Sequence, residues 1–317
     1  MSTEPLACVT LTCRHGTATV LLFGATLISF RVQLQQEEEE EEEAQQVDQQ
    51  QQWRDVVYLS PAAIHDGVTP TRGGVPIVFP QFGAGALIQH GFARRSLWHV
   101  ARKQEDCVVL ELRDGDATRT QWPFAFCLSL EVRLIAAIND GACPSLRMTL
   151  RVSDCTARNF QSLLHTYIHT PTLEGTSVSG LADKSYVDKV DHGNVVSPLP
   201  QATTETRINI VGEVDRVYDS RPSGYSGCVH CPDGRVDVNV RCGIDDGDGN
   251  DETLPACFVL WNPGPMKAAA MKDLTPDSYH NFVCLEAGAL STALQEPLTG
   301  SRQFYLQQTL SFVPAAK

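Results

Sequence analysis

The sequence has no apolar run approaching the roughly 20 residues that a helix needs to cross a bilayer. Residues 1–5 show no basic segment followed by an apolar stretch, so we expect neither secretion nor membrane anchoring. A stripe of Lys and Arg residues is missing as well, which argues against a nucleic-acid partner. Nor does the chain contain a nucleotide-binding glycine motif, a P-loop or a nucleophile elbow. These absences disfavour membrane, nucleic-acid and nucleotide-dependent functions.

Paired cysteines are also scarce, although the chain has 11 cysteines. Most stand singly in segments with strand character, and an odd number without a secretory signal favours reduced, mostly buried thiols. Cys228 and Cys231 form a C-x-x-C, but without a second pair or a βαβ context we interpret it as a turn. We therefore predict a cytoplasmic protein with no metal site.

Long helical periodicity is missing almost everywhere, and alternation of apolar and polar residues takes its place. A period of two is typical of half-buried antiparallel strands. It runs through residues 107–113, 127–138, 146–152 and 236–242, and further strands are indicated at 9–11, 18–23, 26–34 and 55–59. Turn residues separate these segments at the spacing of a sandwich. The prediction is an all-β fold, a large antiparallel β-sandwich.

The strands do not divide into two halves, so we expect residues 1–317 to form one domain. A Gln/Glu segment at about 35–52 is the exception, because it has no apolar face and holds most of the net charge of −13. We interpret it as an insertion, disordered or extended, between two strands. The Asp-rich residues 243–252 lack the spacing of a calcium loop, and we expect a surface turn there.

Two loops rich in Gly and Pro carry polar residues. Arg72 opens the first loop, and Gln89, His90 and Arg94 lie in the second. Glycine and proline at this density prevent a helix and permit tight turns that present side chains to a ligand. Guanidinium groups suit phosphate or sugar hydroxyls. These loops are therefore candidates for substrate binding, with His90 otherwise serving only to brace its loop.

A histidine and a glutamate stand in apolar strand-like segments. His165 and His169 share a strand face, but about 13 Å apart, too far for one zinc ion. Glu286 either faces water or points into a site that needs a proton acceptor. On neighbouring strands of a concave sheet, His165 and Glu286 would provide a general acid and a general base. Asp215 could bind a pair of hydroxyls or could pair with Arg216.

Six segments together resemble the glucose-6-phosphate 1-epimerase family, the hexose-6-phosphate mutarotases among the aldose 1-epimerase-like sandwiches. The segments are residues 72–80, 89–94, 164–167, 214–218, 261–263 and 284–288. The chain departs from the family pattern at residues 264–266, at Ala287 and in the Gln/Glu insertion. The departure at 264–266 puts local loop contacts in doubt, but not the acid and base.

The resemblance implies a galactose mutarotase-like supersandwich that interconverts the α and β anomers of glucose 6-phosphate. It implies His165 as the acid and Glu286 as the base. Its implied substrate contacts are Arg72, Gln89, Arg94 and Asp215, and His90 and Lys267 are further candidates. We expect ring opening and reclosure without a cofactor, in a monomer whose partner is a hexose 6-phosphate.

Two other functions stay open. A mutarotase for neutral aldoses is possible on the same scaffold. The two guanidinium groups of Arg72 and Arg94 argue against it, because placing two charges beside a neutral sugar is energetically costly when only hydroxyls are bound. A carbohydrate-binding or regulatory protein without turnover is the other alternative. That reading would gain force if His165 or Glu286 were replaced, and both are present.

Overall fold

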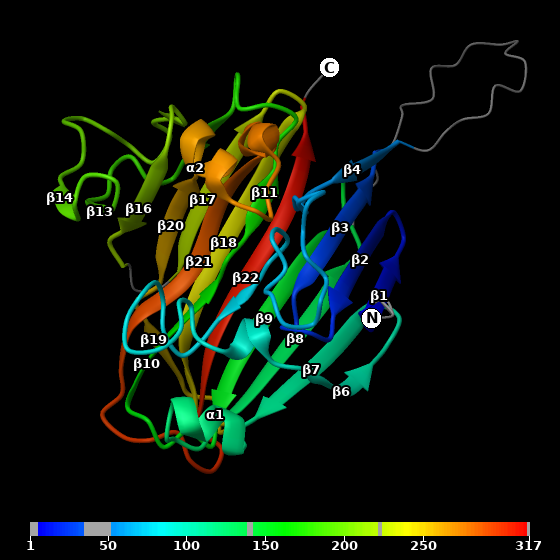
Figure 1. The fold of residues 1–317 in the computed structure, drawn as a ribbon, viewed down its shortest axis with the longest axis vertical. Coiled ribbons are helices and arrows are strands. Elements are labelled where there is room, and N and C mark those ends of the chain that lie inside the picture. The colour runs from blue at the N-terminus through cyan, green and yellow to red at the C-terminus, as the bar shows by residue number, and fades with distance from the viewer. Residues whose placement is uncertain (1–5, 35–51, 138–141, 221–223, 316–317) are drawn as a thin grey trace, which may run out of the picture.

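The computed structural model describes residues 6–34, 52–137, 142–220 and 224–315, and strands make up most of their regular secondary structure (Figure 1). The Gln/Glu insertion falls at residues 35–51, outside the described residues. Among the described residues the strands form a four-stranded, an eight-stranded and a ten-stranded sheet. Their ladders are antiparallel, which confirms the predicted fold class.

The four-stranded sheet consists of β1 (Cys8–Cys13), β2 (Gly16–Leu21), β3 (Leu27–Gln33) and β4 (Trp53–Asp55). The eight-stranded sheet has the order β14 (Asn194–Val196), β13 (Tyr186–Asp188), β16 (Val214–Tyr218), β20 (Cys257–Asn262), β21 (Phe282–Ala293), β10 (Asn159–Leu164) and β5 (Ile77–Val78), and β11 (Tyr167–His169) also pairs with β21.

The ten-stranded sheet has the order β15 (Ile208–Asn209), β12 (Ser177–Ser179), β17 (Tyr225–Cys231), β18 (Gly234–Asp245), β22 (Gln303–Pro314), β9 (Ser145–Ser153), β8 (Cys127–Ile135), β7 (Cys107–Arg113) and β6 (His99–Lys103), and β19 (Asp251–Leu254) pairs with β18. Short helices, α1 (Asp116–Gln121), α2 (Gly264–Ala270) and the 3-10 turns η1 (Ala93–Arg95) and η2 (Pro276–Asn281), lie in the connections.

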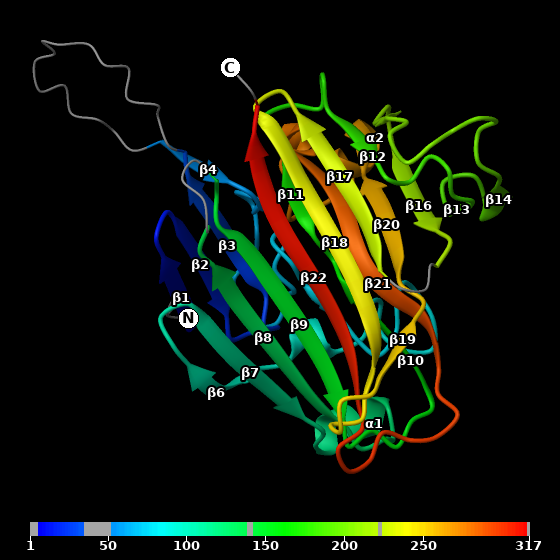
Figure 2. The ribbon, with the colours of Figure 1, turned by 180° about the vertical axis from the view of Figure 1, so that it is seen from behind.

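The two large sheets pack face to face (Figures 1 and 2). Aromatic side chains of the two sheets meet in the core between them. Phe160 of β10 meets Phe304 of β22 at 5.2 Å between ring centroids, and Tyr225 of β17 meets Phe258 of β20 at 4.8 Å. Strands of the ten-stranded sheet keep one face in this core and one in water, which is why their buried residues alternate. Figure 2 shows β18, β22, β9 and β8 side by side on the outer face.

The boundaries that the sequence predicts for strands and loops differ from those in the structure in three places. The strand predicted at 55–59 is β4, which ends at Asp55, because residues 57 and 59 make only single bridges. The loop predicted after residue 263 is helix α2, which begins with glycine and proline at its N-terminal end. The turn predicted at 243–252 is shorter, because its two ends extend β18 and β19. No helix of the described residues is long and apolar enough to cross a membrane.

Candidate active site

Glu286 lies in a strand that is buried on both of its faces. β21 pairs with β20 along one edge and with β10 and β11 along the other, and its first eight residues are all buried. One face packs toward the ten-stranded sheet, and loops cover the other. Only 2% of the Glu286 side chain is exposed. The sequence alternative in which Glu286 faces bulk water is therefore wrong.

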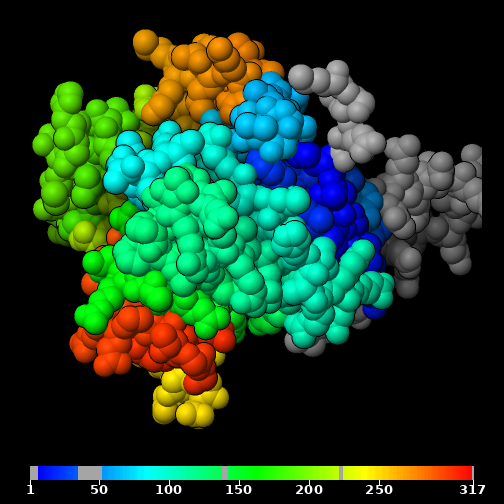
Figure 3. Space-filling model, turned by 60° about the horizontal axis from the view of Figure 1, so that its bottom comes forward, coloured from blue at the N-terminus to red at the C-terminus, as the bar shows by residue number. Residues whose placement is uncertain are grey.

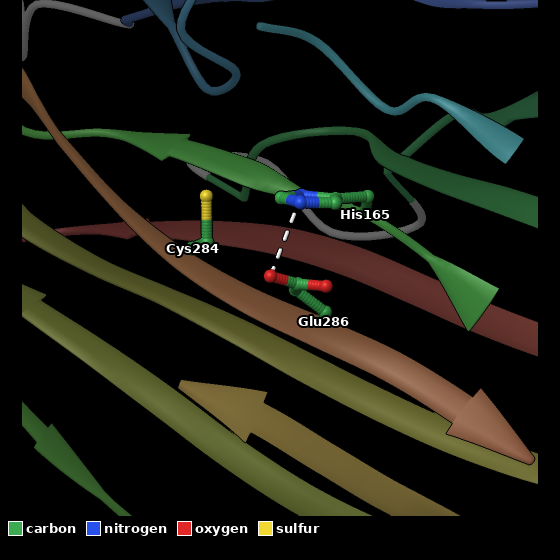
Figure 4. Close-up of side chains that lie close together, drawn as sticks. All are labelled: His165, Cys284 and Glu286. Carbon is green, nitrogen blue, oxygen red and sulfur yellow. Dashed lines mark ion pairs between the residues drawn. The ribbon is translucent and has the colours of Figure 1, made fainter. Parts of the chain in front are cut away.

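His165 owes its position to a break between two strands. Leu164, the last residue of β10, pairs with Ala287, and Tyr167, the first of β11, pairs with Cys284. The two residues between them leave the ladder at the level of Glu286. The Nδ1 atom of His165 lies 3.4 Å from the Oε1 atom of Glu286, and the two side chains point toward each other (Figure 4).

Aromatic rings fix the orientation of the His165 ring. Tyr167 stacks on it at 4.9 Å with an angle of 12° between the ring planes. Trp261 and His90 meet it edge-on, at 5.9 and 5.5 Å between centroids. A histidine enclosed in this way has little rotational freedom, so its nitrogens are held in place for proton transfer.

Burial sets the protonation of the acid–base pair. It raises the pKa of Glu286 well above its usual range, and the nearby Asp215 adds to the shift. It also lowers the pKa of His165 well below its usual range. Both groups are therefore driven toward their neutral forms, and together they hold one proton around neutral pH. Because the two sites interact, that proton belongs to the pair.

Glycines allow the binding loops to approach the sheet closely. At Gly74 the φ angle is 65°, and an added Cβ atom would lie 1.9 Å from the Leu27 carbonyl oxygen. At Gly91 the φ angle is 69°, and a Cβ atom would lie 2.1 Å from the Phe79 carbonyl oxygen. Only glycine fits such positions, and each lies within two residues of a candidate, Arg72 or His90.

His90 is held as a neutral imidazole. Its Nδ1 atom accepts a hydrogen bond from the Gly83 backbone N–H at 3.2 Å, which leaves the ring proton on Nε2. Burial, with the charges of Arg94 and Lys189, lowers the pKa of His90 to about 3. His90 therefore offers an N–H donor and carries no charge in the neutral pH range.

The cations around the pocket differ in how well they are neutralised. Arg72 binds the Asp273 carboxylate at 3.0 Å and donates to the Tyr167 hydroxyl at 2.9 Å. Lys267 binds Glu213 at 2.8 Å.

Lys189 lies 3.5 Å from Asp215, and its ammonium group sits over the Phe82 ring at 5.0 Å. Arg94 donates to the Gln89 carbonyl oxygen at 2.8 Å, and no described carboxylate lies within ion-pair distance of it. Burial lowers the pKa of Arg94 to about 10. Arg94 is therefore the cation whose charge is least compensated.

All eight candidates from the sequence line one cavity of about 240 Å³: Arg72, Gln89, His90, Arg94, His165, Asp215, Lys267 and Glu286. Their individual roles stay predictions. Lys189, Trp261 and Met271 line the same cavity, and sequence reasoning missed them. Trp261 stands in a segment that carried the resemblance, whereas nothing in the sequence marked Lys189. Figure 3 shows the loop segments, in cyan, between the blue N-terminal strands and the yellow-green residues near β13 and β14.

A wider hollow of about 670 Å³ lies elsewhere, over β12, β17 and β18. It is lined by mixed acidic, basic and hydroxyl side chains, including Asp183, Lys184 and Asp237. The hollow is shallow, and the described residues that line it include no acid–base pair comparable to His165 and Glu286. Size alone does not identify a reactive site. The smaller cavity is the candidate active site because it contains the His165–Glu286 pair.

Comparisons with known proteins identify relatives of the chain. Two proteins named "Putative glucose-6-phosphate 1-epimerase" are each 30% identical to the chain. The one from Cenchrus ciliaris matches over 77% of this chain and 70% of its own length, and the one from Salmonella typhimurium over 75% and 74%.

A crystal structure titled as a putative mutarotase from Salmonella typhimurium superposes with a TM-score of 0.74 at 24% identity, covering 99% of this chain and 92% of that one. A galactose mutarotase-related enzyme from Lactobacillus acidophilus gives a TM-score of 0.65 at 14% identity, over 97% of each chain. These structures share the fold. The family model for aldose 1-epimerase matches residues 7–297, and the chain therefore belongs to the aldose 1-epimerase family.

Proposed function

We propose that the protein is a mutarotase that interconverts the α and β anomers of hexose 6-phosphates, with glucose 6-phosphate as its substrate. The observation that carries this proposal is the buried His165–Glu286 pair, 3.4 Å apart, on the floor of a cavity bordered by the uncompensated Arg94. The relatives named for glucose-6-phosphate epimerisation support the choice of substrate. A cytoplasmic monomer stays the expectation from the sequence.

The reaction needs one base and one acid at the same time. Glu286 accepts the proton of the C1 hydroxyl, the bond between C1 and the ring oxygen breaks, and His165 gives the ring oxygen a proton. The product is the open-chain aldehyde. Rotation about the C1–C2 bond presents the other face of the carbonyl, and the reverse transfers close the ring as the other anomer.

The protonation of the pair fits this cycle. Each transfer to Glu286 is matched by one from His165, so the number of protons on the protein does not change. A resting pair with one proton supplies the proton that the reaction requires. Only a carboxylate can accept the C1 proton and only a protonated imidazole can donate one to the ring oxygen, so a proton held on Glu286 first passes to His165, 3.4 Å away. His90 and Asp215 lie in the same cavity and can bind sugar hydroxyls as a donor and an acceptor.

Charge favours a phosphorylated sugar over a neutral one. A partly buried guanidinium such as that of Arg94, without a carboxylate partner, is stabilised when an anion reaches it, and a phosphate group can accept two of its N–H bonds. Arg72 is already neutralised by Asp273, so we assign the phosphate to Arg94, with Lys189 as the second cation. The role of Arg72 is then chiefly to orient Tyr167 through the hydrogen bond to its hydroxyl, and Tyr167 in turn stacks on His165.

Anomer exchange measured by magnetisation-transfer NMR tests the proposal. With purified protein, the exchange rate of glucose 6-phosphate should rise well above that of the buffer, and the rate for glucose should rise far less. Equal acceleration of both sugars would instead support the neutral aldose mutarotase. Binding of either sugar without acceleration would identify a carbohydrate-binding protein on this scaffold.

A further inference from the structure

Cys284 lies beside the acid–base pair and has no part in the mechanism above. It precedes Glu286 by two residues on β21, so both side chains leave the strand on the same face. Figure 4 shows the Cys284 sulfur, the His165 ring and the Glu286 carboxylate together. One ligand atom from each residue lies within 4.8 Å of the other two.

The cluster has unused bonding capacity. Only 9% of the His165 side chain and 2% of the Glu286 side chain are exposed. Within the described residues, His165 Nδ1 and Glu286 Oε2 have no hydrogen-bond partner. Buried polar atoms without partners are uncommon, and each one indicates a missing ligand or a reactive role. Here two of them belong to neighbouring side chains that lie beside a thiol.

Nitrogen, sulfur and carboxylate oxygen are the donors that Zn²⁺ prefers. Three protein ligands and one water are its usual arrangement in an open site, with bonds of about 2.0–2.3 Å, which place neighbouring ligand atoms roughly 3.5 Å apart. The donors around His165 would have to move inward by about 1 Å at most. The adjoining cavity supplies an entry path and space for the water.

The charges also permit a cation at this point. A divalent ion, the Cys284 thiolate, the Glu286 carboxylate and a neutral His165 sum to zero charge. Binding therefore adds no net charge beside Arg94, and the protons of the thiol and the carboxyl group pass to solvent. A bound ion would occupy both groups of the acid–base pair.

We propose that His165, Cys284 and Glu286 form a binding site for a thiophilic divalent cation such as Zn²⁺, and that the cation blocks turnover by engaging the acid–base pair. The binding half of this inference stands independently, whereas the inhibition half rests on the proposed function. Metal and sugar phosphate then exclude each other, because both require His165 and Glu286.

Cadmium titration of the full chain tests the site directly, because a thiolate bound to Cd²⁺ gives an ultraviolet charge-transfer band. In a non-thiol reductant, we expect the wild type to show a component that saturates at one Cd²⁺ per chain and is displaced by Zn²⁺. Cys284→Ala should weaken that component at least tenfold. Cys257→Ala, which removes an equally buried thiol from the adjacent strand β20, should leave it unchanged.

A band of wild-type strength and affinity in Cys284→Ala would overturn the proposal. If that variant does not fold, Glu286→Gln decides: at least tenfold weaker binding supports the site, and unchanged binding refutes it. Zn²⁺ should also slow anomer exchange competitively with glucose 6-phosphate. A protein that binds Cd²⁺ in this way but exchanges no sugar would disprove the proposed function and leave the metal site standing.

Discussion

The strands β8 and β21 show what burial does to a carboxylate in this fold. Both are central antiparallel strands of a large sheet. β8 has a face in water, and its Glu131 is surrounded by arginines, with Arg102 and Arg133 within 3.4 Å. β21 has no such face, and one oxygen of Glu286 lacks a partner among the described residues.

The difference explains where the reactive group lies. A carboxylate at the solvated face of a sheet that pairs with arginines contributes little to stability. A carboxylate in a strand covered on both sides meets a histidine, and burial raises its pKa. Residue type alone does not separate Glu131 from Glu286, whereas the layer in which each strand lies does.

Replacing Glu286 and Glu131, each in its own variant, by glutamine should give the largest difference in anomer exchange rate. Glu286→Gln removes the base, and we expect anomer exchange of glucose 6-phosphate to fall by about 10²–10⁴-fold. Glu131→Gln, the matched change on the solvated strand, should alter the rate less than about twofold, since surface substitutions rarely propagate. NMR exchange rates on both variants check this, and equal losses would contradict the comparison.

Removing the uncompensated cation should affect binding of the phosphate selectively. Arg94→Gln should raise KM for glucose 6-phosphate by about 10–100-fold, the loss of one charge-assisted contact, and should leave any slow turnover of glucose unchanged. Arg95→Gln is the control, because the neighbouring Arg95 does not line the cavity. A similar fall in activity toward both sugars would contradict this assignment and would indicate that Arg94 stabilises the structure of the site.

The pH profile should distinguish a buried pair from an exposed one. A second proton on the pair removes the base, and loss of the last proton removes the acid. Exposed His and Glu would hold one proton only between about pH 4.3 and 6.5. Burial lowers the pKa of His165 and raises that of Glu286, so we expect kcat/KM to be flat across roughly pH 6–8. A steady decline above about pH 6.5 would indicate an ordinary histidine.

Glu286→Gln should also stabilise the fold. Because the pKa of Glu286 is raised in the folded state, the unfolded chain sheds this proton at lower pH, and native stability declines as pH rises between the two pKa values. The amide avoids that loss. We expect a Tm rise of about 2–5 °C at pH 7 that vanishes below about pH 4. Thermal unfolding at both pH values checks the sign.

The Gln/Glu insertion should have the smallest effect. Its ends join the paired strands β3 and β4, where the Leu34 N–H donates to the Gln52 carbonyl oxygen at 2.9 Å. Replacing residues 36–51 by Asn-Gly should close a short hairpin and change Tm and exchange rate by less than about 2 °C and twofold. Lost folding or activity would show that the segment has a role.

Much of the fold could be predicted because alternation is a local signal. Residues 146–152 alternate strictly and form most of β9, and the less regular alternation at 107–113 coincides with β7. Helix α2 was missed because a Gly-Pro pair is as typical of a loop as of the first turn of a helix. The ends of the buried strands were also harder to predict, because a continuous run of apolar residues has no periodicity.

The candidate site was predictable only in part. Polar residues in unusual surroundings, such as His165 and Glu286, were visible in the sequence. Contacts between distant segments were not: Asp273 neutralises Arg72, and Cys284 comes to lie beside His165 through strand pairing. Pairings of this kind depend on tertiary register, which no local pattern reports.

The protonation of Glu286 in the resting protein tests the central claim most directly. An infrared difference spectrum, wild type minus Glu286→Gln at pH 7, should contain the carbonyl stretch of a protonated carboxylic acid, with Glu131→Gln as the matched control variant on strand β8. That band is the result expected of a carboxyl group kept neutral by burial between two layers. A carboxylate signal for Glu286 in that spectrum would contradict it, because the shared proton would then lie on His165 or on neither group.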